Sequence, residues 1–108
     1  MITDFANTKK LLAGMEKSGL DFSQPLKWRF YFYDENRPAL NRLFEELEDD
    51  HFKLESISET SDGEWILEVS KIEVLSAEKL HRRNMAFNEL AEVCGVQLYD
   101  SWDVEQDG

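Results

Sequence analysis

The fold is organised around the stretch Trp28-Arg29-Phe30-Tyr31-Phe32-Tyr33-Asp34, in which five of six consecutive residues are aromatic. Aromatic residues favour β-strands because their rings pack well on a pleated surface. Side chains alternate between the two faces of a strand, so Trp28, Phe30 and Phe32 share one face. We therefore predict a central strand whose apolar face packs on helices and whose other face is amphipathic.

Three segments have the apolar periodicity of amphipathic helices, with residues suited to capping at their starts. The predicted helices are residues 3–18, capped by Thr3; a segment after Asp34 or Asn36 that ends near Glu48; and a segment between Ser76 and Gly95. In the first helix, the predicted apolar stripe consists of Phe5, Leu11, Leu12 and Met15. Because Gly14 weakens this helix, it should need to dock on the rest of the domain.

The dipeptide Asp62-Gly63 is a strong hairpin signal, because both residues tolerate the positive φ of a tight turn. It joins two predicted antiparallel strands, residues 53–60 and 64–74. If these two residues are the centre of the turn, Ile57 and Ile66 point away from the core. A last strand should run from residue 96 to about residue 104.

The end of the second strand of this hairpin interrupts the alternation of apolar residues. A bulge near Ser70 would return Ile72 and Val74 to the core side of the sheet.

After the first helix, the order of predicted elements is β-α-β-β-α-β, which is the split βαβ of ferredoxin-like domains. We predict an α+β fold in one domain, residues 1–108: an N-terminal helix over 3–18 and a ferredoxin-like core over 26–104. Its four-stranded antiparallel sheet carries two helices on one face. The other face should carry Tyr31, Tyr33, Ile57 and Ile66. The N-terminal helix or a partner could cover it.

The charge of the chain is strongly negative, with 23 acidic and 12 basic side chains and a formal net charge of −11. Proteins that bind nucleic acid directly use clustered Lys and Arg, so this balance argues against such binding. An RNA-recognition domain with this topology would stack bases on Tyr31 and Tyr33, but Glu68 and Glu55 oppose them. We expect a protein partner with a basic surface, although the charge could also serve solubility alone.

The chain contains one cysteine, Cys94, and no signal-like segment, which favours a reducing cytoplasm. Its apolar runs are far shorter than the roughly 20 residues of a membrane helix. The histidines, His51 and His81, are distant from Cys94 in sequence and lack zinc-site spacing. Ser76 and Lys79 match a serine-lysine motif of penicillin-recognising enzymes, but its companion motifs are absent. We predict no enzyme activity, cofactor or metal.

Three stretches and the aromatic strand together resemble a known family: Ser18-Gly19-Leu20-Asp21, Asp62-Gly63-Glu64-Trp65 and, most specifically, Tyr99-Asp100-Ser101-Trp102. They are similar to the bacterial family of ribonuclease E inhibitor protein B, regulators of RNA turnover. The resemblance implies a ferredoxin-like domain without catalysis. It also implies binding to ribonuclease E outside its catalytic half, which changes the transcripts that the degradation machinery cuts.

Two groups of residues are the predicted partner-binding site, namely the carboxylates Glu45, Glu46, Glu48 and Asp49 and the closing-strand residues Tyr99, Asp100 and Trp102. The carboxylates would attract a basic segment of a ribonuclease, and Trp102, if exposed, would anchor it. If buried, Trp102 would be a core residue instead. The alternative function is a ligand-responsive or dimerising regulatory module without a ribonuclease partner, and a homodimer is possible.

Overall fold

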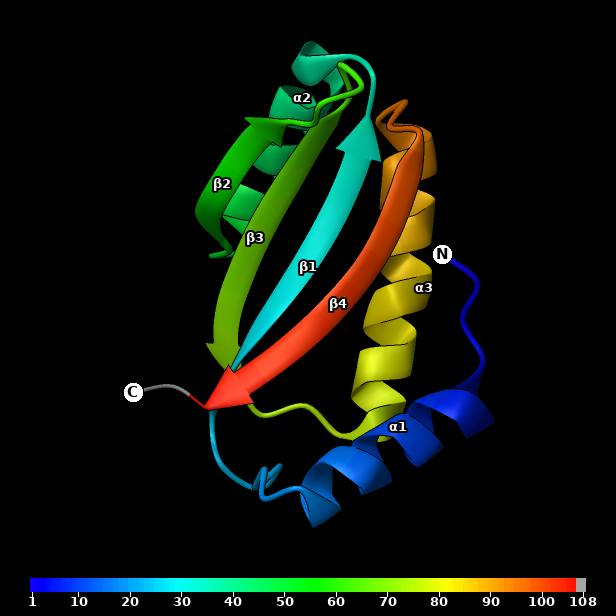
Figure 1. Cartoon of the computed structure of the whole chain (residues 1–108), viewed down its shortest axis with the longest axis vertical. Coiled ribbons are helices and arrows are strands. Elements are labelled where there is room, and N and C mark those ends of the chain that lie inside the picture. The colour runs from blue at the N-terminus through cyan, green and yellow to red at the C-terminus, as the bar shows by residue number, and fades with distance from the viewer. Residues whose placement is uncertain (107–108) are drawn as a thin grey trace.

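The computed structural model describes residues 1–106. Its elements are α1 (Phe5–Lys17), β1 (Leu26–Asp34), α2 (Arg37–Asp49), β2 (Lys53–Glu59), β3 (Trp65–Glu73), α3 (Ala77–Val93) and β4 (Leu98–Gln106). The four strands form one antiparallel sheet in the order β2-β3-β1-β4, and α2 and α3 lie on the same face of it (Figure 1). The predicted α+β, split βαβ fold is confirmed, with β1 and β3 at the centre.

Strand β1 forms the middle of the core, because its side chains alternate strictly between buried and half-buried. Trp28, Phe30 and Phe32 are each 0% exposed. The ring of Phe87 in α3 packs edge-on against Phe30 at 5.1 Å between centroids. Leu40 of α2 is also fully buried, so both helices contribute to one apolar layer behind the sheet. Each such side chain contributes roughly 1.5–3 kcal/mol by leaving water.

Helix α1 begins at Phe5 rather than at Thr3, because the Asp4 carboxylate caps it by accepting a hydrogen bond from the Ala6 N–H. The predicted apolar stripe is wrong in part. Leu12 is buried, but Phe5 and Leu11 are 40% and 46% exposed. Thr8 is buried as well, and α1 packs against α3.

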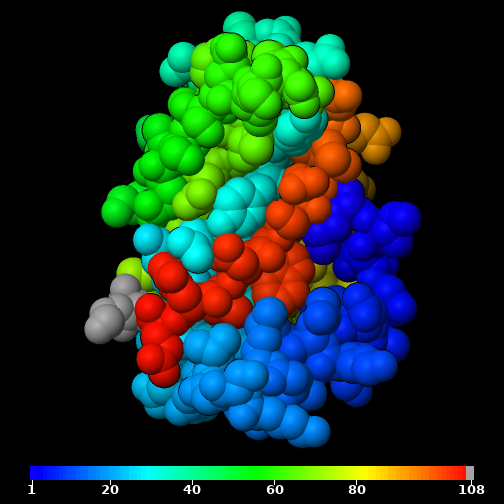
Figure 2. Space-filling view, viewed as in Figure 1, coloured from blue at the N-terminus to red at the C-terminus, as the bar shows by residue number. Residues whose placement is uncertain are grey.

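The N-terminal helix leaves the second face of the sheet uncovered. Helix α1 lies beyond one end of the sheet and packs against α3 (Figure 1). In the space-filling view, residues of all four strands reach the surface on the face that points away from α2 and α3 (Figure 2). The sequence suggested two possible covers for this face, the N-terminal helix and a partner. Helix α1 does not cover it.

The hairpin between β2 and β3 has a three-residue loop, not the predicted two-residue turn. The Thr60 N–H donates to the Glu64 carbonyl at 2.7 Å, which leaves residues 61–63 as the loop, with Gly63 at φ 81. One extra loop residue moves every side chain of β2 to the other face. Ile57 therefore pairs with Leu67 and packs against the core, contrary to expectation.

The predicted bulge near Ser70 is also wrong, because β1 and β3 pair without interruption. Ile72 is 54% exposed and Val74 is 45% exposed, so neither returns to the core. The bulges lie in the two edge strands, at Glu55 of β2 and Asp100 of β4, where the register shifts by one residue. Edge strands tolerate an extra residue because they have a neighbour on one side only.

None of the helices within residues 1–106 is both long enough and apolar enough to cross a membrane.

Candidate protein-binding surfaces

We define the open face as the sheet surface that points away from α2 and α3. Its side chains form four rows across the strands, because directly paired residues point to the same side. From the hairpin end, the rows are Leu98–Tyr33–Ile66–Ser58, Ser101–Tyr31–Glu68–Ser56, Asp103–Arg29–Ser70–Lys53 and Glu105–Lys27–Ile72, and Glu55 joins them from its bulge. The first row is mainly apolar, and the last two are mainly charged.

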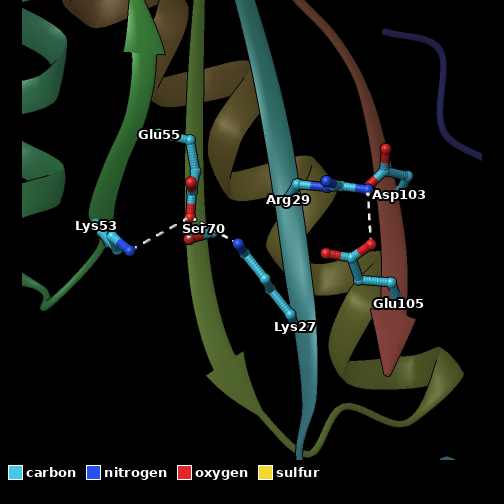
Figure 3. Close-up of polar contacts among 7 residues, drawn as sticks. All are labelled: Lys27, Arg29, Lys53, Glu55, Ser70, Asp103 and Glu105. Atoms are coloured by element: carbon cyan, nitrogen blue, oxygen red, sulfur yellow. Dashed lines mark hydrogen bonds and ion pairs between the residues drawn. The ribbon is translucent and has the colours of Figure 1, made fainter. Parts of the chain in front are cut away.

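Ion pairs fill the charged half of the open face (Figure 3). Lys27 Nζ lies 2.9 Å from a Glu55 oxygen, and Lys53 Nζ lies 4.0 Å from the same oxygen. Arg29 contacts Asp103 at 2.6 Å and Glu105 at 3.4 Å. The cations of this half are therefore held by carboxylates of the edge strands.

Two hydrogen bonds extend this network and shift pKa values. The Ser70 hydroxyl donates to Glu55 at 2.7 Å and, together with Lys27, holds the pKa of that carboxyl below its ordinary value. The Tyr31 hydroxyl donates to Asp103 at 2.8 Å. Partial burial, followed by this hydrogen bond, raises the pKa of Tyr31. The phenol therefore stays protonated and acts as a donor.

Replacing Glu55 with glutamine should destabilise the protein above about pH 5 but not in strong acid. A carboxyl whose folded pKa lies below its ordinary value of 4.5 adds stability that is complete above that value and is lost as the pH falls through the folded pKa. The difference in unfolding free energy between wild type and Glu55→Gln should therefore shrink as the pH falls below about 4.5. Urea melts across a pH series measure it. A constant difference would contradict the assignment.

The predicted acidic group lies on the other layer of the molecule. Glu45, Glu46, Glu48 and Asp49 are all exposed near the C-terminal end of α2, on the helix side of the sheet. No basic residue occupies the last turn of α2. The negative charge of the carboxylates therefore adds to the negative end of the helix dipole. All four carboxylates are thus exposed near the end of α2, and their role in partner binding stays a prediction.

The three closing-strand residues have different environments. Tyr99 is 1% exposed, and its hydroxyl donates to Asn84 Oδ1 at 2.6 Å, so this side chain belongs to the core. Burial raises its pKa. Asp100 is exposed at the bulge, and Trp102 is half-buried, 5.9 Å from the Trp28 ring. Direct partner contact through Tyr99 is therefore incompatible with its burial.

The bulge explains why Tyr99 and Trp102 share a face although they are three residues apart. The extra residue, Asp100, lets both rings point towards the helices, where Tyr99 pairs with Phe32 and Trp102 with Phe30. The open-face residues Asp103 and Glu105 were missed by the sequence reasoning. The spacing of Asp103 and Glu105, two residues apart on one strand, indicates that they share a face. Only the register of β4 against β1 shows that this is the open face.

Among the hollows on the surface of the described residues, two illustrate where the ligand-binding alternative would seat a small molecule. One, of about 390 Å³, lies beside Lys27, His51 and Lys53 at the charged end of the open face. The other, of about 450 Å³, lies between α1 and the start of α3, beside Leu12 and Ala77. The first is lined mainly by groups that already pair with one another.

The residues considered for catalysis or metal binding lie apart. His81 contacts Thr3 and Phe5 near the N-terminus, whereas Cys94 is partly buried at the end of α3. Burial raises the pKa of the Cys94 thiol, which disfavours the reactive thiolate. Within residues 1–106, no three potential metal-ligating side chains of His, Cys, Asp or Glu form a group.

A family model described as regulator of ribonuclease activity B matches residues 5–104. The match spans all seven elements apart from the last two residues of β4. The chain belongs to this family. The members are regulators of a ribonuclease rather than a class of enzymes, in agreement with the resemblance found in the sequence. No curated protein gave a significant match to the chain.

Proposed function

We propose that the protein is a non-catalytic regulator that binds a ribonuclease of the ribonuclease E type through the basic, non-catalytic region of that enzyme. By occupying this region, it changes which RNAs the enzyme degrades. The observation that carries the proposal is the family match over residues 5–104. The resemblance of Tyr99-Asp100-Ser101-Trp102 to the family's closing strand supports the same assignment.

The charge of the protein supports a basic partner. The formal net charge is −11, and opposite potentials speed the encounter of two proteins. The carboxylates Glu45, Glu46, Glu48 and Asp49 are exposed, and within residues 1–106 none of them forms an ion pair. They can therefore act at long range without first breaking an internal contact. Asp100 and the accessible part of Trp102 could contribute close contacts.

A pull-down with and without nuclease tests the proposal. The purified protein should be retained by an immobilised non-catalytic fragment of ribonuclease E, and nuclease treatment should leave the retained amount unchanged. Retention that disappears with nuclease would mean that RNA bridges the two proteins. The same preparation should give blank gel shifts with RNA at moderate salt, since the chain is strongly acidic. Failure to bind the fragment would contradict the proposal.

Neutralising the α2 carboxylates should slow association with this fragment. In the variant Glu45→Gln/Glu46→Gln/Glu48→Gln/Asp49→Asn, the association rate at low salt should fall about tenfold, and its salt dependence should flatten. The dissociation rate should change little, because steering acts before contact. Stopped-flow or surface-plasmon kinetics at several salt concentrations measure both rates.

The matched control neutralises four exposed carboxylates from separate parts of the chain, Glu16, Glu35, Glu59 and Glu89, and so makes the same change in net charge. If the α2 end is the docking site, this control should slow association by no more than about twofold. Equal slowing by the two variants would mean that only total charge matters. The α2 variant should remain folded, because its carboxylates face the negative end of a helix dipole.

A further inference from the structure

The open face is the face of the sheet that nothing within residues 1–106 covers. Helices α2 and α3 pack on the opposite face, and α1 docks at the end of the sheet (Figures 1 and 2). Its first row places Tyr33 between Ile66 and Leu98 on three adjacent strands, and Leu98 is 38% exposed. A sheet that needed only to be soluble would carry polar side chains here. This row is suited to a desolvated contact with another molecule.

The second row contains a carboxylate without a counter-ion. Glu68 lies on the central strand β3, directly opposite Tyr31, and is half-buried. Among the residues that the structure describes, no Lys, Arg or His nitrogen lies within 4.0 Å of its carboxylate, and no side-chain hydrogen bond reaches it. The other three carboxylates of the open face, Glu55, Asp103 and Glu105, all have cationic partners.

The neighbours of Glu68 leave it accessible to an incoming cation. The Tyr31 hydroxyl donates its hydrogen bond to Asp103 on β4, whereas Glu68 lies on β3, on the other side of β1. This hydroxyl therefore points away from Glu68. The charge of Glu68 is nevertheless close enough to contribute to the raised pKa of Tyr31. A half-buried carboxylate beside tyrosine rings offers both charge and aromatic surface to an arginine or lysine side chain.

We propose that the open face is a second docking surface, for a basic peptide segment that places an arginine or lysine side chain against Glu68 and apolar atoms against Tyr33, Ile66 and Leu98. The identity of the segment as part of a ribonuclease rests on the proposed function. The surface itself is separate from the α2 end, which lies on the other layer. Nucleic acid does not fit, because the cations of this face are already paired and a phosphate would meet Glu68.

The test compares Glu68→Gln with Glu89→Gln, which makes the same charge change at an exposed position on α3. Two ligands are used, the ribonuclease E fragment and a synthetic arginine-rich peptide, and calorimetry at physiological salt gives each Kd. Glu68→Gln should raise the Kd of both ligands about tenfold, and Glu89→Gln should change each Kd less than twofold. Amide shift changes in the wild type should centre on Tyr31, Tyr33 and Ile66.

Several outcomes would overturn the proposal: equal affinities of the two variants, shift changes confined to the end of α2, or an RNA oligonucleotide that binds the open face. Failure of the proposed function looks different. In that case the arginine-rich peptide still binds at Glu68 while the ribonuclease fragment does not bind the wild type at all. Conversely, a fragment that binds the wild type and Glu68→Gln equally well rejects the open face and retains the function. Thermal melts confirm that Glu68→Gln is folded.

Discussion

Replacing Trp28 with alanine should lower the free energy of unfolding by about 3–5 kcal/mol, a large part of the roughly 5–15 kcal/mol of a typical domain. The side chain is 0% exposed, and its indole N–H donates to the Glu73 carbonyl at 3.1 Å. Its ring packs 5.9 Å from each of the Phe22 and Trp102 rings. The substitution therefore removes a large apolar group and leaves a partly buried carbonyl without this donor. Urea melts with an unchanged m-value measure the loss.

Tyr31→Ala is the informative comparison, because it removes an aromatic ring from the other face of the same strand. The Tyr31 side chain is half-buried on the open face, so its loss should cost about 1–2 kcal/mol, mainly a charge-assisted hydrogen bond to Asp103. Trp28→Phe keeps most of the packing and should be milder than Trp28→Ala. A larger loss for Tyr31→Ala than for Trp28→Ala would contradict the assignment of the strand faces.

Replacing Arg83 with methionine should cost about 3 kcal/mol, the low end of the range for breaking a buried ion pair. Arg83 donates two hydrogen bonds to Glu73, at 2.6 and 2.8 Å, and the two side chains are 19% and 17% exposed. Its guanidinium also lies 5.2 Å from the Phe52 ring centroid and 5.5 Å from that of Phe30. Methionine fills a similar volume but leaves the Glu73 charge without a partner.

The double variant Arg83→Met/Glu73→Gln checks this explanation. If the cost of Arg83→Met comes from an unpaired carboxylate, removing the charge of Glu73 should restore about half of the lost stability. Melts of both single variants and of the double variant complete the cycle. Additive losses would mean that the two side chains stabilise the fold independently. A loss below about 1 kcal/mol for Arg83→Met would mean that the pair behaves like a solvated surface ion pair.

Local patterns were sufficient to predict the elements and their order. The alternation of Trp28, Phe30 and Phe32 reflects the geometry of a strand and holds wherever that strand is placed. The exposure of the α2 carboxylates could also be predicted from a local pattern, because the apolar residues of the helix define its buried side. Tyr99 was misassigned because its burial depends on the bulge at Asp100, a property of strand pairing.

The sequence by itself therefore determined the central strand, the split βαβ order and the resemblance to the family of ribonuclease regulators. Only the tertiary structure decided which side chains meet. The three-residue hairpin loop turned Ile57 towards the core, and the docking of α1 on α3 left the open face uncovered. The register of the four strands gave Lys27 and Arg29 carboxylate partners and left Glu68 without a cation. The physical reason is that a shift of one residue reverses a strand's faces, and register depends on contacts between segments distant in sequence.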